Sequence, residues 1–103
     1  MAILALTTSA EVTKEIYDNL RKELNWEQNP APGCLMHCAA FGSGGMHVAD
    51  IWASEQDHTN FVKTRLMGAF QKLKLGQPKS EIYPLHNVNL FAPAEKFKLA
   101  QTH

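Results

Sequence analysis

The sequence predicts an α+β fold of the ferredoxin-like type, with its elements in the order βαββαβ. Three observations lead to this prediction. Two segments carry apolar residues at helical spacing, two apolar runs flank a glycine-rich turn, and one more apolar run stands at each end of the series. Such a chain forms a four-stranded antiparallel sheet with both helices on one face. The 103 residues suit a single domain, which we place at 1–91, followed by a C-terminal tail over 92–103.

The first strand and the first helix are expected within residues 2–24. Residues 2–7 form an apolar run, and Thr8 and Ser9 follow as possible helix N-caps. Beyond them apolar residues recur every four positions, which indicates an amphipathic helix of about 16 residues. The recurring residues are Val12, Ile16, Leu20 and Leu24. Residues 29–33 contain two prolines and a glycine, so they end the helix and form a loop.

Residues 33–41 and 46–52 are expected to form a hairpin around a turn at 42–45. If all four turn residues form the loop, Phe41 lies opposite Met46. Counting away from the turn two residues at a time on each strand then gives the other opposed pairs on this face. His37 then lies opposite Asp50, and Leu35 lies opposite Trp52. Directly opposed residues share one face of an antiparallel pair. The hairpin therefore predicts a histidine beside an aspartate within an otherwise apolar patch.

The second helix and the last strand complete the fold. Ser54 is the expected N-cap, with Asp57 three residues later as in a capping box. A helical stripe follows, and residues 76–78 stop the helix. The stripe consists of Phe61, Val62, Leu66, Ala69, Phe70 and Leu73. Residues 81–91 are the last strand, in which Pro84 indicates an edge position or a bulge.

The face of the hairpin away from His37 is also mostly apolar. Its residues are Cys34, Met36, Cys38, Ala40, His47, Ala49, Ile51 and Ala53. A sheet that is apolar on both faces must bury both, and two helices cover only one. We therefore expect the second face to pack against another copy of the chain in a homodimer.

Composition excludes several classes of partner. Ten basic and ten acidic residues balance without any block of like charge, so no nucleic-acid partner is expected. The longest apolar runs are too short for a membrane helix, and the N-terminus lacks the basic region of a signal peptide. Cys34 and Cys38 would lie about 13 Å apart on one strand, too far for a disulfide. Unpaired thiols favour a reducing compartment, so we expect a cytoplasmic protein.

Several stretches together resemble the dimeric α/β-barrel superfamily, close to its antibiotic-biosynthesis-monooxygenase-like domains in small bacterial proteins. They are Leu35-Met-His37, the glycine-rich turn, residues 48–55, Phe61-Val62, Arg65-Leu66 and residues 83–88. The resemblance covers about residues 2–91. It implies two protomers whose sheets face each other, with a pocket in each between sheet and helices. The superfamily includes cofactor-free quinone-forming monooxygenases, haem-degrading enzymes, isomerases and lactone-forming enzymes, so the resemblance implies no single reaction.

The strongest candidates for chemistry are His37 and Asp50. A carboxylate beside an imidazole fixes its tautomer and raises its pKa toward use as a general base. The other interpretation is a buried polar pair that only satisfies its own hydrogen bonds. Trp52 and His86 are candidates for positioning a substrate, by an aromatic wall and an imidazole on the last strand. Their alternatives are core packing for Trp52 and a structural histidine for His86.

Weaker candidates stand on the helices. Tyr17 and Arg65 lie beside the apolar stripes, and each could point a polar tip into a pocket between sheet and helices. Arg65 could bind a substrate carboxylate or enolate, whereas a boundary position is the simpler interpretation for both. Phe61 is assigned to the substrate pocket as part of the second helical stripe.

No metal or other cofactor is expected. Two histidines and a carboxylate, His37, His86 and Asp50, could converge as in non-haem iron sites, but no local histidine spacing supports this. His58 is expected on an exposed first helical turn. A haem would need an axial histidine, for which His37 and His86 are equal candidates. No glycine-rich phosphate loop precedes a helix.

Three functions follow as hypotheses. The first is a cofactor-independent enzyme, monooxygenase-like or catalysing proton transfer, that acts on a small aromatic or polyketide-like compound. His37 would be its base and Asp50 the partner that orients it. The second is a non-catalytic dimer that binds a small apolar ligand in the same pocket. The third is a haem-binding or haem-degrading protein.

Overall fold

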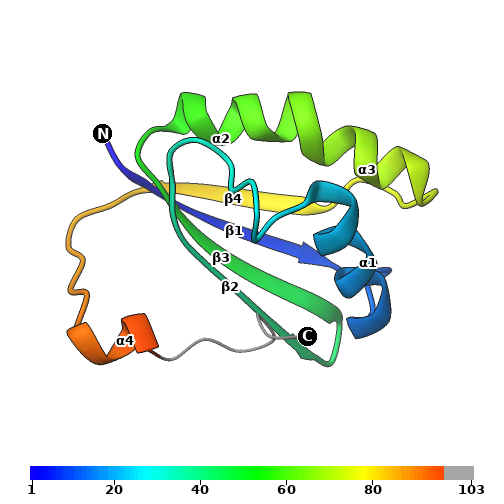
Figure 1. Ribbon diagram of the computed structural model, residues 1–103, viewed down its shortest axis with the longest axis horizontal. Helices are drawn as coiled ribbons and strands as arrows, with labels where there is room; N and C mark the ends of the chain where they lie inside the picture. Colours follow the sequence, from blue (N-terminus) through cyan, green and yellow to red (C-terminus); the bar gives the residue numbers. More distant parts are fainter. Residues whose placement is uncertain (97–103) are drawn as a thin grey trace.

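The computed structural model describes residues 1–96 and confirms the predicted ferredoxin-like α+β fold. Four antiparallel strands form one sheet in the order β2-β3-β1-β4, and the helices α1 and α2–α3 cover one face of it (Figure 1). The strands are β1 (Ile3–Ser9), β2 (Cys34–Gly42), β3 (Gly45–Trp52) and β4 (Lys79–Pro84). The helices are α1 (Lys14–Leu24), α2 (Glu55–Phe61), η1 (Val62–Leu66), α3 (Met67–Lys72) and α4 (Ala92–Lys96).

The central strand β1 shows why the core lies between sheet and helices. Its odd-numbered residues are buried and its even-numbered residues are half-buried, as the two-residue period of a strand requires. The buried face packs against two clusters of apolar side chains. One is Val12, Leu20, Met46, Val48, Ala69 and Phe70, and the other is Ile3, Ala5, Ala31, Trp52 and Phe61.

The first helix begins later than predicted. Its N-cap is Thr13, whose side chain accepts a hydrogen bond from the backbone N–H of Ile16. Thr8 and Ser9 belong instead to β1, where they pair with β3. Because the ladder holds these residues extended, they cannot start a helix. The helix ends at Asn25, which adopts the left-handed conformation with a φ of 51°.

The hairpin is tighter than predicted and contains an irregularity. Gly42 pairs with Gly45, so the turn has two central residues rather than four. A β-bulge shifts the register between Cys34 and Met36, and it is therefore Cys34, not Leu35, that lies opposite Trp52. The prediction for Leu35 was wrong for this reason. Cys34 consequently packs on the helix-covered face, against the Trp52 cluster.

Gly45 is required by close packing. Its φ of 99° is in the left-handed region, and a Cβ atom there would lie 2.3 Å from the backbone oxygen of Ser9. The turn therefore approaches β1 directly, which fixes β3 beside it.

The second helical segment agrees with its predicted start. Ser54 caps α2 and accepts a hydrogen bond from the N–H of Asp57. One π-helical stretch, η1, lies within the segment and continues into α3 without a break in the ribbon (Figure 1).

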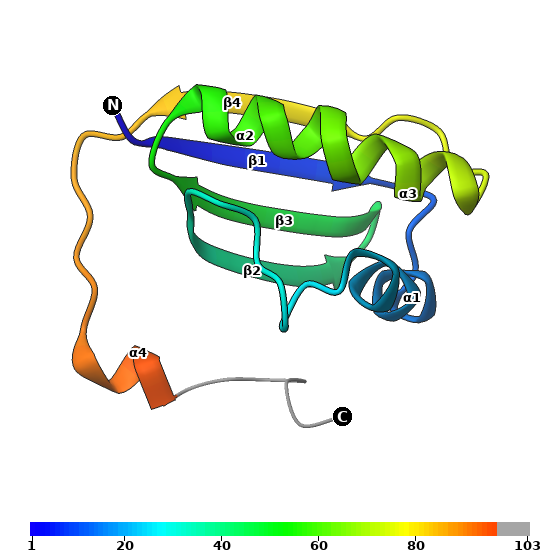
Figure 2. The same cartoon turned by 45° about the horizontal axis from the view of Figure 1, so that its top comes forward.

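The last strand is shorter than predicted. β4 pairs with β1 from Lys79 to Pro84, where Pro84 lies opposite Ile3. The predicted strand over 81–91 therefore ends at Pro84, which occupies the edge of the sheet as expected. One more backbone bond joins Leu85 N–H to the carbonyl of Ala2. The chain then leaves the sheet as an exposed arm that ends in α4, on the side away from the other helices (Figure 2). Residues 97–103 of the predicted tail lie outside the described residues.

The other face of the sheet is apolar around the middle of the hairpin and the start of β1, as the hairpin pattern predicted, and it is polar at its β4 edge, where Glu81 lies opposite Leu6. Leu4 and Leu6 of β1 are half-buried there, and Ile51 lies beside Leu4 on β3. Met36 of β2 pairs with Ile51 and extends this surface to the edge strand. Both helical layers lie on the opposite face (Figures 1 and 2). Within residues 1–96, no helix combines the length and apolar character needed to cross a membrane.

Candidate functional site: a tyrosine–histidine–aspartate chain

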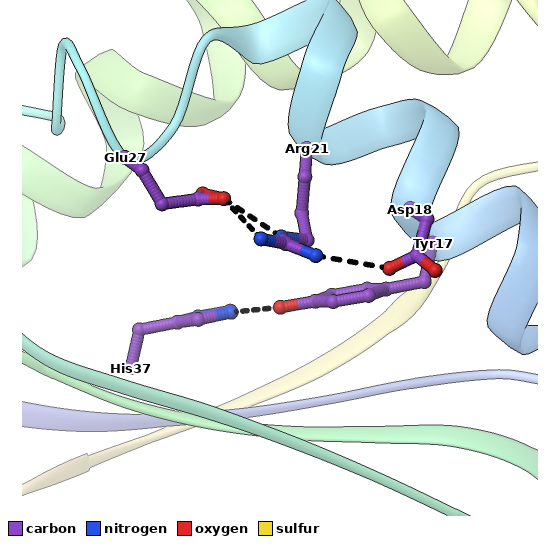
Figure 3. Close-up of polar contacts among 5 residues, drawn as sticks. All are labelled: Tyr17, Asp18, Arg21, Glu27 and His37. Atoms are coloured by element: carbon purple, nitrogen blue, oxygen red, sulfur yellow. Dashed lines mark hydrogen bonds and ion pairs between the residues drawn. The ribbon is translucent and has the colours of Figure 1, made fainter. Parts of the chain in front are cut away.

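Two short hydrogen bonds join three side chains from three different elements. Nδ1 of His37, on β2, lies 2.6 Å from Oδ1 of Asp50, on β3. Nε2 of the same ring lies 2.7 Å from the hydroxyl of Tyr17, on α1 (Figure 3). The predicted cross-strand pair is therefore present, and a phenol on the neighbouring helix extends it.

The strands determine how the pair meets. His37 and Asp50 are directly opposed, and their side chains point toward the helices. The Asp50 side chain is 9% exposed and that of His37 is 20% exposed. A buried carboxylate accepts a hydrogen bond, so we assign the proton of the neutral ring to Nδ1. Nε2 then carries the lone pair and accepts the hydrogen bond of the Tyr17 hydroxyl.

Tyr17 is held as a neutral phenol. Burial raises its pKa to about 12, against the nearby positive charge of Arg21, which acts in the opposite direction. The phenol therefore keeps its proton at neutral pH and remains a hydrogen-bond donor. Its ring packs edge-on against Phe41 of β2, with ring centroids 5.8 Å apart.

Two further residues of the site were not predicted. The ring of Trp26 lies 5.0 Å from that of His37, and Trp26 comes from the loop after α1. Arg21 lies one helical turn after Tyr17 and is held between Glu27 and Asp18, next to the Tyr17–His37 pair (Figure 3). The i,i+4 spacing of Tyr17 and Arg21 was visible in the sequence. The loop position of Trp26 gave no periodic signal.

Two hollows of different size adjoin the hydrogen-bonded Tyr17–His37–Asp50 chain. A cavity of about 70 Å³ lies between the sheet and the helices, and a groove of about 570 Å³ lies outside, between α1, the following loop and the edge strand β2. Four side chains line both: Tyr17, Arg21, Trp26 and His37. We call these four residues the shared wall. A pocket between sheet and helices was predicted, and the cavity occupies that place at a small volume.

Phe61 and Trp52 take different places around the cavity. Phe61 lines it, as expected for a residue of the second stripe. Trp52 lies behind Phe61, is fully buried and lines neither hollow, which is the core-packing alternative. Its Nε1 has no hydrogen-bond partner within residues 1–96.

His58 is buried, not exposed as predicted. It is 9% exposed, and its ring contacts that of Trp52 at 5.4 Å between centroids. The first turn of α2 packs onto the end of β3, which the helical pattern alone does not reveal. Burial lowers the pKa of His58, and the ring lines the cavity in its neutral form.

Arg65 and His86 do not contact the hydrogen-bonded Tyr17–His37–Asp50 chain. The guanidinium of Arg65 donates to the carbonyl oxygens of Leu24 and Asn29, at 2.5 and 2.7 Å, and so ties the loop after α1 to η1. His86 is exposed in the arm beyond β4, because Pro84 ends the strand that was to carry it. Neither residue lines the cavity or the groove.

The described residues offer no cluster for a metal. Within residues 1–96, no group of three or more His, Cys, Asp or Glu side chains could hold an ion. The three residues considered for a non-haem iron site do not converge, since His86 lies in the arm.

Comparisons with known proteins show the fold. No family model matches the sequence, and no curated protein matches it. Among solved structures, a protein of unknown function from Nitrosomonas europaea superposes with a TM-score of 0.64 at 20% identity, over 88% of this chain and 94% of that one. The cofactor-independent oxygenase SnoaB from Streptomyces nogalater superposes with a TM-score of 0.58 at 9% identity, over 84% and 94%.

A candidate antibiotic biosynthesis monooxygenase from Deinococcus radiodurans also superposes, with a TM-score of 0.54 at 20% identity, over 89% of this chain and all of that one (100%). The chain therefore has the ferredoxin-like fold found in antibiotic-biosynthesis-monooxygenase-like proteins, as the sequence resemblance implied. At these identities the similarity extends to the fold and not to a particular activity.

Proposed function

We propose that this protein is a cofactor-independent enzyme that removes a proton from a small aromatic or polyketide-like compound, whose carbanion then reacts with dioxygen. The observation that carries the proposal is the hydrogen-bonded chain Asp50–His37–Tyr17, which ends at the shared wall of cavity and groove. An imidazole oriented by a carboxylate is a frequent general base. Support of a general kind comes from the cofactor-independent oxygenase that has the same fold.

The groove is the proposed site of the organic substrate. Its volume of about 570 Å³ falls in the range of small-molecule pockets, roughly 300–1,000 Å³. Aromatic side chains of Tyr17, Trp26 and Phe41 line it together with apolar residues of β2. A flat aromatic compound can stack on such a wall and place an acidic C–H or O–H group near His37.

Proton removal begins with an exchange of hydrogen bonds. The acidic group of the substrate takes the place of the Tyr17 hydroxyl at Nε2 of His37, which then accepts the proton. Asp50, at 2.6 Å from Nδ1, stabilises the imidazolium that forms. The hydroxyl of Tyr17, still protonated because burial raises its pKa to about 12, is free to donate to the substrate oxygen on which negative charge develops.

The oxidation balances without a cofactor. For a CH₂ group between two aromatic rings, the carbanion transfers electrons to dioxygen and a C–O bond forms, giving a peroxide anion. The His37 imidazolium returns its proton to that anion, and the hydroperoxide loses water together with the second C–H proton. The net change is CH₂ plus O₂ to C=O plus H₂O, in which carbon is oxidised and dioxygen is the oxidant.

We further propose that the protein works as a homodimer in the cytoplasm. The apolar face with Leu4, Leu6 and Ile51 is the one that α1 and α2–α3 leave uncovered, and a second copy would cover it. The arm adds exposed apolar side chains, with Leu90 68% and Phe91 71% exposed. Both cysteines are free thiols, as a reducing compartment favours. Analytical ultracentrifugation of the full chain tests the dimer, and a monomer at micromolar concentration would contradict it.

The experiment measures dioxygen uptake with anthrone as the probe, in buffer containing a metal chelator. The wild-type protein should consume dioxygen and form anthraquinone faster than the buffer alone. His37→Ala should lose about 10²–10⁴-fold of that rate, which is the usual contribution of a general base. His86→Ala is the matched control, because His86 is exposed in the arm and lines neither the cavity nor the groove.

Two other outcomes would favour the remaining hypotheses. Anthrone binding can be monitored by the quenching of Trp26 fluorescence. Binding without any dioxygen uptake would favour a ligand-binding dimer. A Soret band on titration with haem that disappears in His37→Ala would favour haem binding. Both ring nitrogens of His37 already make hydrogen bonds, so an axial ligand at Nε2 would have to displace Tyr17.

A further inference from the structure

The cavity behind the shared wall is too small for the substrate of the groove. Its volume is about 70 Å³, whereas an apolar cavity of about 150 Å³ is the size that accommodates benzene or xenon. A compound with two or more fused rings cannot enter it. A molecule of two heavy atoms can.

The lining of the cavity favours an apolar occupant over water. Most of its side chains are aliphatic or aromatic, and they come from α1, β3 and the α2–α3 layer. They are Leu20, Leu24, Met46, Val48, Phe61, Leu66 and Phe70. A buried water needs two to four polar partners. Most polar groups at the cavity are already paired, since Thr7 bonds to Ser80, Asp50 bonds to His37, and the His37 ring also bonds to Tyr17.

The position of the cavity relates it to the reaction. His37 and Tyr17 line both hollows, so an occupant of the cavity lies across the imidazole and the phenol from a substrate in the groove. The Tyr17 hydroxyl, which the substrate displaces from Nε2 of His37 in the proposed reaction, belongs to this shared wall. A small oxidant stored in the cavity would then meet the carbanion from the protein side, while the substrate shields it from solvent.

We infer that the cavity between the sheet and the helices is a binding site for dioxygen. The identity of the gas rests on the proposed oxygenation, whereas the ability of the cavity to take up a small apolar gas does not. The two can therefore fail separately. If the cavity binds dioxygen but the protein does not oxygenate anthrone, the proposed function is wrong and the gas site remains.

The test uses dioxygen itself, which is paramagnetic and accelerates the NMR relaxation of nearby methyl groups. Methyl spectra of the full chain are recorded under elevated dioxygen pressure and under the same pressure of nitrogen. The methyls of Leu20, Val48 and Leu66 should relax faster under dioxygen than the buried methyls of Val12 and Ile3, which do not line the cavity. Equal enhancement at lining and non-lining methyls would overturn the inference.

A cavity-filling variant makes the test specific. Val48→Ile adds one methylene to the cavity and should reduce the enhancement at Leu20 and Leu66 by roughly tenfold, the low end for one methylene in a tight apolar pocket. Val62→Ile is the matched control, because Val62 is half-buried in η1 and does not line the cavity. If neither Val48→Ile nor Val62→Ile changes the relaxation enhancement at Leu20 and Leu66, dioxygen binds elsewhere.

Turnover provides the second measurement for the same pair of variants. With anthrone, Val48→Ile should raise the KM for dioxygen while the KM for anthrone and the kcat at saturating dioxygen stay near the wild-type values. Val62→Ile should change none of the three. An active Val48→Ile enzyme with an unchanged KM for dioxygen would overturn the assignment of the cavity to dioxygen, even if the proposed oxygenation is correct.

Discussion

The hydroxyl of Tyr17 lies 2.7 Å from Nε2 of His37, so the nitrogen proposed as the base is hydrogen bonded before any substrate arrives. The bond keeps the imidazole oriented toward α1, and it places the phenol where a substrate must bind. Tyr17 thus has two proposed roles, one in the free protein and one in the reaction. Substitution of this single residue separates them.

Tyr17→Phe removes the hydroxyl and keeps the ring. The free energy of unfolding should fall by about 1 kcal/mol, the net worth of one hydrogen bond. The kcat with anthrone should fall by about 10²–10³-fold if the phenol donates to developing negative charge, while KM changes little. Tyr83→Phe is the control, since this exposed phenol bonds to Glu81 alone within residues 1–96. A Tyr17→Phe enzyme with wild-type kcat would show that the phenol only orients His37.

Asp50→Asn tests how the carboxylate fixes the tautomer of His37. An amide at this position can donate to Nδ1, which would move the ring proton to Nε2 and remove the lone pair that accepts the substrate proton. The kcat should drop by about 10²–10⁴-fold, as when a carboxylate that orients a catalytic histidine is removed. Nitrogen NMR of His37 should report the exchanged tautomer. Glu15→Gln is the control, because Glu15 is an exposed carboxylate on α1 that lines neither the cavity nor the groove.

The site shows which relationships a sequence can predict. The pairing of His37 with Asp50 depends on the hairpin register, which the turn fixes from its own residues. The pairs counted from the turn agree with the structure as far as Met36. Between Met36 and Cys34 a β-bulge adds one residue to β2, and the apolar pattern gives no sign of it. Leu35 was therefore misplaced, although His37, two residues nearer the turn, was not.

Relationships between elements were harder to predict. The contact of Tyr17 with His37 depends on where α1 docks along the sheet, and helical periodicity gives the face of a helix but not its position. The burial of His58 follows from the angle at which α2 leaves β3. Trp26 lies in a loop, where no period applies, and reaches the site because Arg65 ties that loop to η1. These three features come from tertiary packing.

The buried His58 should make stability depend on pH near neutrality. Burial lowers its pKa in the folded state below the unfolded value of 6.5, so between these values the unfolded chain binds the extra proton. Its contribution to stability is complete above pH 6.5 and is lost as pH falls through the folded pKa. The Tm of the wild-type protein should therefore decrease on acidification from pH 7 to pH 5. His58→Gln should show a shallower decrease, whereas His86→Gln, at an exposed position in the arm, should follow the wild type. Parallel curves for the wild type and His58→Gln would contradict this account.

Arg65 should act on stability and on the shape of the groove, not as a substrate ligand. Its guanidinium holds the last carbonyl of α1 at Leu24 and that of Asn29, so Arg65→Ala frees both ends of the loop that carries Trp26. The free energy of unfolding should fall by about 2 kcal/mol, since hydrogen bonds from a charged donor contribute about 1.5–3 kcal/mol. Arg65→Lys should recover only part of this, because one ammonium cannot reproduce the planar fork of the guanidinium.

Lys63→Ala, an exposed change in the same segment, should stay within about 0.5 kcal/mol of the wild type. Urea unfolding measures all three variants, and a shift of Trp26 emission to longer wavelength in native Arg65→Ala would report the loosened loop. If Arg65→Ala and Lys63→Ala unfold at the same urea concentration, the two carbonyl contacts do not hold the loop, and the rigidity of the shared wall must come from Arg21 and its carboxylate partners.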